Sequence, residues 1–291
     1  MPKVIGIGKQ RYDRIIENNL FYIDKTMFIK EWWENKDIVT LITRPRRFGK
    51  TLNMNILECF FSNQYKDRGD LFEGLDIWKE EKYRELQGTY PVISLSFARI
   101  KERDYEKTKQ KMCEVLRNIY IKFCYIKDSE KLTDADRAYY ERMLEENIKE
   151  TDATSSLYQL SDFLYRYYGK KVIILLDEYD TPMQEAFVDG YWDELVAFTR
   201  SLFNSTFKTN PALERGIMTG ITRVSKESVF SDLNNLKIVT TTSNEYASVF
   251  GFTEKEVFDA LEQYGLEKEK KEVKRWYDGF IFGEHKDIYN P

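Results

Sequence analysis

IVTLITRPRRFGKT, at residues 38–51, combines an apolar run, a polar loop and the beginning of a helix. The near-continuous apolar run at 38–42 is typical of a strand that is buried on both faces of a parallel sheet. From Leu52 to Phe61 the apolar side chains recur on one side of a helix. A buried strand, a short loop and a helix in this order predict an α/β fold.

The loop of this stretch matches the end of the phosphate-binding motif G-x-x-x-x-G-K-[ST], in which backbone N–H groups at a helix N-terminus surround phosphate oxygens. Lys50 is predicted to reach the β- and γ-phosphates, and the Thr51 hydroxyl to hold Mg²⁺. Arg44 stands where the motif has its first glycine. Taken alone, the stretch is explained equally well by an ordinary turn with solvated arginines. The predicted nucleotide contacts are Arg44, Pro45, Arg46, Arg47, Phe48, Gly49, Lys50, Thr51 and Leu52.

A second apolar run, KVIILLDE at residues 171–178, ends in two carboxylates. Open α/β sheets bind ligands outside the carboxyl ends of their strands, so these acids stand where a nucleotide would lie. In this Walker B arrangement, Asp177 is predicted to hold Mg²⁺ and Glu178 to polarise the attacking water. A strand that merely leaves the core at an acidic loop is a frequent alternative, but two matches in the expected order favour nucleotide binding.

A third strand is predicted at residues 215–223, RGIMTGITR, and it has a polar tip. In P-loop ATPases with a catalytic glutamate after the Walker B aspartate, the next strand lies beside the strand of the phosphate-binding loop. A polar residue at the end of that strand can sense the γ-phosphate, and Thr222 and Arg223 are the candidates. An ordinary strand exit explains these two residues about as well. Whether Arg223 acts in its own subunit or in a neighbour's stays open.

The composition predicts a soluble globular protein, since 42% of the 291 residues are hydrophobic and 32% are charged. A net charge of −4 argues against a generally basic nucleic-acid-binding surface, although a local patch formed by the loop arginines stays open. Three cysteines without a C-x-x-C pair and a single histidine argue against a structural zinc site. With neither an apolar run of ~18 residues nor the apolar part of a signal peptide, a cytoplasmic protein is expected.

Periodicity along the rest of the chain predicts a helical insertion at 101–168 and a further strand near 237–242. Thr253 and Glu256 form a capping box at the start of a C-terminal helix, and an aromatic hairpin turn is predicted at 277–283. The predicted domains are a P-loop ATPase-like domain at 1–250 and the start of a C-terminal helical segment at 251–291. The sequence ends directly after a predicted ordered element, which indicates part of a longer protein.

Several stretches together resemble the bacterial AAA-ATPase-like proteins, which are often fused to a C-terminal nuclease-like domain of the PD-(D/E)XK class. In that family the first glycine of the loop is also commonly arginine. The resemblance implies a P-loop NTPase-type parallel sheet with helices on both faces, whereas the nuclease-like domain would follow residue 291. The stretches that carry the resemblance are 22–26 (YIDKT), 43–51 (TRPRRFGKT), 90–93 (YPVI), 176–182 (LDEYDTP), 219–225 (TGITRVS), 276–280 (WYDGF) and 288–291 (IYNP).

These features predict a Mg²⁺-dependent ATPase whose cycle moves the helical insertion or the C-terminal part. Catalysis would rest on positioning and on charge stabilisation by Lys50, Arg46 and Arg47. A nucleotide-binding switch that hydrolyses ATP slowly or not at all is the alternative, and nucleic-acid binding through the arginines is a weaker one. The expected partners are the nucleotide and either another protein or the nuclease-like domain of a longer chain, and the oligomeric state stays open.

Overall fold

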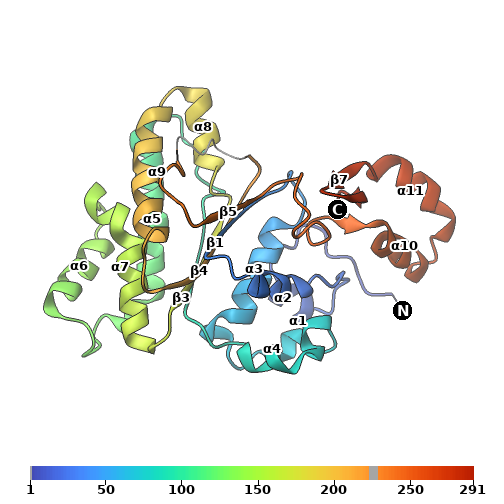
Figure 1. Cartoon of the computed structure of the whole chain (residues 1–291), viewed down its shortest axis with the longest axis horizontal. Helices are drawn as coiled ribbons and strands as arrows, with labels where there is room; N and C mark the ends of the chain where they lie inside the picture. Colours follow the sequence, from blue (N-terminus) through green and yellow to red (C-terminus); the bar gives the residue numbers. More distant parts are fainter. Residues whose placement is uncertain (1, 223–228) are drawn as a thin grey trace. The chain divides into compact units, whose positions relative to one another are not determined.

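The computed structural model describes residues 2–222 and 229–291 (Figure 1). The chain divides into two compact units. The loop unit consists of Met1–Lys36, Ile42–Thr89 and Val239–Pro291, and the sheet unit consists of Asp37–Leu41 and Tyr90–Ile238. The domain bounds predicted from the sequence, 1–250 and 251–291, stay a prediction.

The sheet is five-stranded and mostly parallel, with the strand order β2-β3-β4-β1-β5. The inner strand β3 pairs in parallel with β2 and with β4, and all of its residues are buried, as the apolar run that ends in two acids predicts. β1 lies between β4 and β5, so the strand that leads into the candidate loop is an inner strand, as expected. The strands are β1 (Val39–Thr43), β2 (Val92–Ser96), β3 (Val172–Asp177), β4 (Leu213–Gly220) and β5 (Leu236–Val239).

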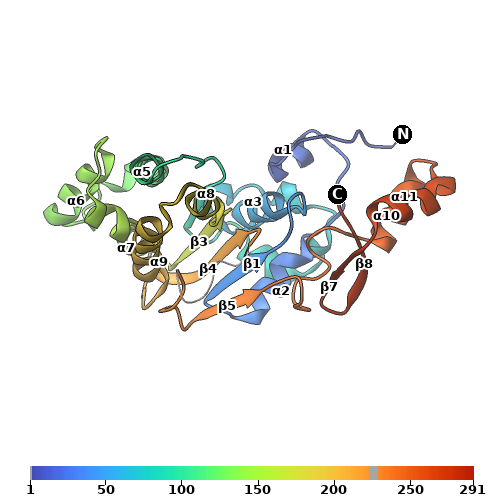
Figure 2. The ribbon, with the colours of Figure 1, turned by 90° about the horizontal axis from the view of Figure 1, so that it is seen from above.

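The helical region predicted at 101–168 forms the connection between β2 and β3. α5 contacts β2, α7 contacts β3, and α7 packs along α9 (Figures 1 and 2). Local signals set the helix ends, because Thr133 and Asp136 form a capping box and Gly169 ends a helix in the left-handed conformation. The helices of this unit are α5 (Tyr105–Lys122), η4 (Cys124–Ile126), α6 (Asp134–Leu144), α7 (Glu150–Tyr168), α8 (Thr181–Asp189) and α9 (Trp192–Phe207).

The loop unit contains the helix that follows the candidate loop and a small antiparallel sheet with the order β6-β8-β7. The segment 62–74 contains the short helices η1 (Asn63–Tyr65) and η2 (Gly69–Phe72), in which Leu71 and Phe72 are buried. The remaining elements are α1 (Tyr12–Glu17), α2 (Met27–Asn35), α3 (Lys50–Phe61), η1 (Asn63–Tyr65), η2 (Gly69–Phe72), η3 (Asp76–Lys79), α4 (Glu81–Leu86), β6 (Phe252–Thr253), α10 (Glu254–Gln263), η5 (Glu267–Glu269), α11 (Lys270–Tyr277), β7 (Phe280–Phe282) and β8 (His285–Tyr289).

The C-terminal segment contains an antiparallel hairpin formed by β7 and β8, with its turn at the end of the predicted range 277–283. Thr253 and Glu256 form the predicted capping box at α10. The turn follows β7 and contains Gly283, the last residue of the predicted range, at φ 57°. A Cβ atom at this position would lie 2.1 Å from Oδ1 of Asn244, so the close approach of the two segments requires glycine. This contact spans 39 positions of the chain, 283 − 244, and local turn signals do not reveal it.

The cysteine side chains differ in their exposure. Cys59 and Cys113 are buried, whereas Cys124 is exposed. Burial raises the pKa of Cys59 to about 12 and that of Cys113 to about 11, so both thiols are protonated at neutral pH. Within the described ranges, no helix has both the length and the apolar character that crossing a membrane requires.

Candidate functional site

The candidate phosphate-binding loop connects β1 with α3 and has two residues with positive φ. These are Arg47, at 69°, and Gly49, at 74°. Glycine adopts this conformation without steric cost, whereas a non-glycine residue there carries strain of the kind that gathers at functional sites. Arg44 is not among the positive-φ residues, which explains how the loop accepts an arginine at the first position of the motif.

Lys50 folds back over this loop. Its side chain is buried, and its ammonium group donates hydrogen bonds to the backbone oxygens of Arg44, at 3.0 Å, and Pro45, at 2.9 Å. The backbone from 44 to 50 therefore curves around a cation. α3 begins at Lys50 without a side-chain cap at Gly49, so its N-terminus offers the N–H groups and the partial positive charge that attract anions. Thr51 and Leu52 lie in the first turn of the same helix.

The arginines of the loop fall into two groups. Arg46 and Arg47 are exposed. Arg44 is fully buried and donates to the backbone oxygens of Thr43, at 3.0 Å, and Glu245, at 3.3 Å. Burial lowers the pKa of Arg44 to about 10, so its guanidinium still carries a charge at neutral pH. Phe48 is buried as well, which leaves the backbone groups of Arg44 and Phe48 for the predicted nucleotide contacts.

Replacing Arg46 and Arg47 together by alanine is expected to weaken anion binding more than it lowers the melting temperature. Exposed arginines stabilise a fold little, whereas two cations beside a phosphate contribute directly to its binding. Isothermal titration with inorganic triphosphate and a thermal melt of the double variant check this expectation. Parallel losses of affinity and melting temperature would instead assign the pair a structural role.

The carboxyl end of β3 brings Asp177, Glu178 and Thr219 together within the sheet unit. Asp177 is 5% exposed, and its Oδ1 accepts a hydrogen bond from the hydroxyl of Thr219. The same hydroxyl accepts from the backbone N–H of Glu178 at 3.4 Å. Glu178 has φ 50°, and its Oε2 accepts from the hydroxyl of Thr181 at 3.1 Å. The two acids therefore have fixed and different surroundings, with Asp177 in the sheet and Glu178 on a strained turn.

Asp180 ties this turn to the end of β4. Its Oδ2 accepts hydrogen bonds from the backbone N–H groups of Ile221, at 3.0 Å, and Thr222, at 2.7 Å, and from the Thr222 hydroxyl, at 2.7 Å. The hydroxyl of Tyr179 donates to the carbonyl oxygen of Thr222 at 2.9 Å. Thr222, a predicted γ-phosphate sensor, is thus held by the residues that follow the acids. Arg223 lies outside the described residues.

Thr219 and Asp180 hold this end of the sheet together through their hydrogen bonds. Neither residue was among the site residues predicted from the sequence. Thr219 is a fully buried polar residue within the apolar strand β4, and a hydroxyl in such a run is the signal that could have identified it. Asp180 is the third acid within four residues after the apolar run of β3. The hydrogen-bond partners of Thr219 and Asp180 could not be assigned from the sequence, because each hydrogen bond joins residues about forty positions apart.

Replacing Asp180 by alanine is expected to lower the free energy of unfolding by about 1–3 kcal/mol, because backbone donors at Ile221 and Thr222 lose their acceptor. Asp180→Asn keeps an acceptor oxygen and serves as the matched control, with a smaller loss. Urea denaturation of both variants measures the difference. Equal losses in the two variants would show that these hydrogen bonds contribute little.

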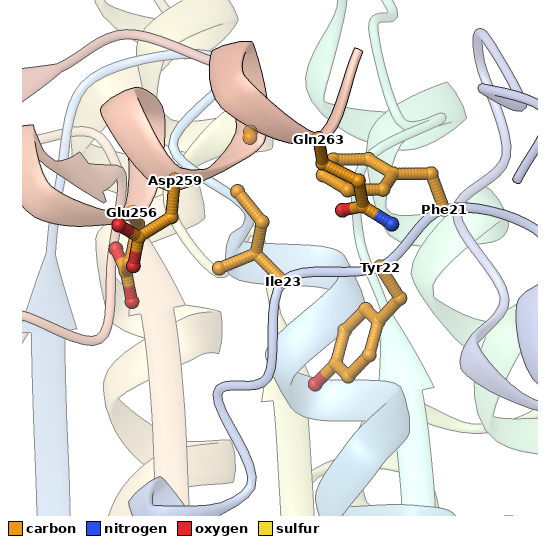
Figure 3. Close-up of a pocket in the computed structure, with 7 residues that line it drawn as sticks. Phe21, Tyr22, Ile23, Glu256, Asp259 and Gln263 are labelled. Atoms are coloured by element: carbon orange, nitrogen blue, oxygen red, sulfur yellow. The ribbon is translucent and has the colours of Figure 1, made fainter. Parts of the chain in front are cut away.

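A cavity of about 190 Å³ also lies in the loop unit, between the segment 21–23 and α10 (Figure 3). It is smaller than the roughly 300 Å³ at which pockets for drug-sized ligands begin, so it cannot enclose a whole nucleotide. Its acids are paired, since Glu256 accepts from Lys25 at 2.6 Å and Asp259 accepts from Lys255 at 2.6 Å. The lining residues are Phe21, Tyr22, Ile23, Glu256, Asp259, Ala260 and Gln263.

Comparison with known proteins identifies a family for this chain. The family model described as predicted AAA-ATPase matches residues 6–230, which include both the loop and the acidic end of β3. A protein of Azotobacter chroococcum mcd 1, described as an uncharacterized protein in the vnfD 5' region, is 28% identical over 296 residues. That alignment covers 99% of this chain and 50% of the relative, so the chain spans about half of the relative's length. No solved structure gives a significant match. The chain belongs to the predicted AAA-ATPase family.

Proposed function

We propose that this chain binds ATP with Mg²⁺ through the loop at 44–50 and hydrolyses it. The observation that carries the proposal is the loop backbone folded around the ammonium group of Lys50, directly before the uncapped N-terminus of α3. Such a loop offers N–H groups, a helix dipole and a fixed cation to one anion. The membership of the predicted AAA-ATPase family supports a nucleotide as that anion.

The oxygen donors that Mg²⁺ prefers are available in the residues assigned to it. Asp177 supplies a carboxylate at the end of a rigid inner strand, and Thr51 supplies a hydroxyl in the first turn of α3. Carboxylate and hydroxyl oxygens together with phosphate oxygens suit the hard, octahedral Mg²⁺ ion. When bound, the ion would offset phosphate charge. Lys50 would neutralise the β- and γ-phosphates, and the exposed Arg46 and Arg47 would add to this charge.

Glu178 is the proposed residue that orients the attacking water. Its carboxylate accepts from the Thr181 hydroxyl at 3.1 Å, which restricts the side chain to a narrow set of orientations. Thr222, held by Asp180, is the proposed γ-phosphate sensor, and Arg223 is proposed to stabilise charge in the transition state. The proposed setting is the cytoplasm, where a partner protein or a further domain would respond to the cycle.

A nucleotide-binding switch with little or no turnover is the second candidate. The observation that favours it is Arg44 at the first position of the motif, which departs from the standard loop. A third candidate, nucleic-acid binding through exposed Arg46 and Arg47, predicts an affinity that falls by orders of magnitude over a few-fold rise in salt concentration. A filter-binding assay with short duplex DNA at two salt concentrations tests it.

Titration with ATP, in Mg²⁺ buffer and in EDTA, separates the first two candidates. The expected result is a rise in melting temperature with ATP that is larger with Mg²⁺, together with release of inorganic phosphate that requires Mg²⁺. Stabilisation by ATP without phosphate release under any condition would favour the switch. No effect of ATP on the melting temperature and no binding by isothermal titration would overturn the proposed function altogether.

A further inference from the structure

Arg44 is buried against aromatic rings that lie about two hundred positions further along the chain. Its guanidinium carbon is 4.7 Å from the ring centroid of Phe282 and 5.6 Å from that of Phe250. A guanidinium over aromatic faces is attracted by their quadrupoles, most strongly where water is excluded. With the hydrogen bond from Arg44 to the carbonyl oxygen of Glu245, this side chain fixes the beginning of the loop to the C-terminal segment.

Phe48 attaches the end of the loop to the same segment. Its ring centroid lies 4.8 Å from that of Phe280 and 5.4 Å from that of Phe282. A Cβ atom at Gly251 would lie 2.9 Å from the Phe48 ring, so this glycine allows the backbone to approach the ring closely. Phe48 is fully buried in this contact.

Phe250, Phe280 and Phe282, which we call the aromatic clamp, are themselves held in place. Phe250 packs edge-on against Phe28 of α2 at 5.6 Å between ring centroids. The hairpin that carries the other two rings is attached to the preceding segment through the N–H of Gly283, which donates to the carbonyl oxygen of Thr241 at 2.9 Å. The clamp is thus a fixed support for the loop.

We propose that the aromatic clamp positions the phosphate-binding loop by holding Arg44 and Phe48 on either side of its exposed tip, and so sets the affinity for the nucleotide. This inference rests on the proposed function, since it assigns the clamp to the same binding loop. It also gives a physical reason for the arginine at the first motif position. The side chain of Arg44 is the tether by which the C-terminal hairpin holds the loop.

The tip between the two tethers carries a strained residue, Arg47 at φ 69°. Such a conformation persists only where the surrounding structure enforces it. If the clamp is weakened, the loop spends less time in the binding conformation. The apparent Kd then equals the intrinsic Kd divided by the fraction of molecules whose loop is in that conformation. At saturating ATP the phosphates themselves hold the loop, so kcat is expected to change little. A clamp effect therefore appears in Kd and KM and not in kcat.

The test replaces Phe282 by leucine, which keeps an apolar side chain but removes the ring face under Arg44. We expect the Kd for ATP with Mg²⁺ to rise about tenfold, and kcat at saturation to stay within about twofold of wild type. In the absence of nucleotide, hydrogen exchange of the peptide that contains residues 44–50 should be faster than in wild type. Phe203→Leu is the matched control, because Phe203 is equally buried and stacks on Phe230 in the sheet unit. This control should lose stability without a change in Kd or in loop exchange.

Arg44→Met is the second variant, since a buried charge replaced by an apolar side chain of similar length need not destabilise the fold. Faster exchange at 44–50 with a retained melting temperature supports the tether. Unchanged exchange in both folded variants would overturn the inference, as would a loss of kcat without a change in Kd. If wild type binds no nucleotide, the proposed function fails on its own, and the exchange comparison still decides whether the clamp holds the loop. If Phe282→Leu does not fold, the same comparison is made with Arg44→Met.

Discussion

Replacing Glu178 by glutamine is expected to leave ATP binding intact and to lower turnover by roughly two to four orders of magnitude, the usual scale for the loss of a positioned acid or base. Glutamine keeps the size and shape of the side chain and one oxygen that can accept from Thr181. It cannot take up a proton or polarise a water molecule as a carboxylate does. The strained backbone at this position stays the same, because neither residue is a glycine.

Two measurements on the same sample check this expectation. Isothermal titration gives the affinity for ATP with Mg²⁺, and phosphate release gives kcat at saturation. Glu194→Gln on α9 is the matched control, since it makes the same chemical change at an exposed position of the same unit and should behave as wild type. If Glu178→Gln hydrolysed ATP at the wild-type rate, Glu178 would not be the residue that orients the attacking water. The Walker B assignment of Asp177 and Glu178 would then be wrong.

Replacing Lys50 by alanine is expected to reduce ATP affinity at least tenfold, which corresponds to about 1.4 kcal/mol of binding free energy. The variant removes a cation that the loop backbone surrounds, with hydrogen bonds to the carbonyl oxygens of Arg44 and Pro45. Charge-assisted contacts to phosphate in a partly dry site are stronger than those between neutral groups. Lys50→Ala should therefore lower the affinity for ATP itself, whereas Glu178→Gln should lower only the turnover rate.

Lys66→Ala is the matched control for this variant, because Lys66 is an exposed lysine of the same unit. Nucleotide affinity is measured with and without Mg²⁺, and a thermal melt without nucleotide shows whether the fold is retained. A folded Lys50→Ala variant that binds ATP as tightly as wild type would contradict the assignment of 44–51 as the phosphate-binding loop. The exposed Arg46 and Arg47 would then have a role other than phosphate binding.

Local sequence patterns were sufficient for the parts of the fold that depend on neighbouring residues. The apolar runs at 38–42 and 172–176 predicted inner strands, since a near-continuous apolar run is typical of a strand covered on both faces. The capping box of Thr253 and Glu256 marked the start of α10, because the cap and its partner are three residues apart. The loop at 44–50 and the acids after β3 were located by the same reasoning, from their places at strand ends.

The sequence by itself thus determined the strand, loop and helix order, the position of the candidate loop and the family. Tertiary structure alone decided which side chains hold that loop, since Arg44 and Phe48 are buried against Phe250, Phe280 and Phe282, far along the chain. It also decided that Asp180 holds Thr222 and that the C-terminal turn lies at Gly283. The physical reason is the range of the interactions: helix periodicity and caps act over a few residues, whereas a buried cation or carboxylate is satisfied by whichever groups the fold brings to it.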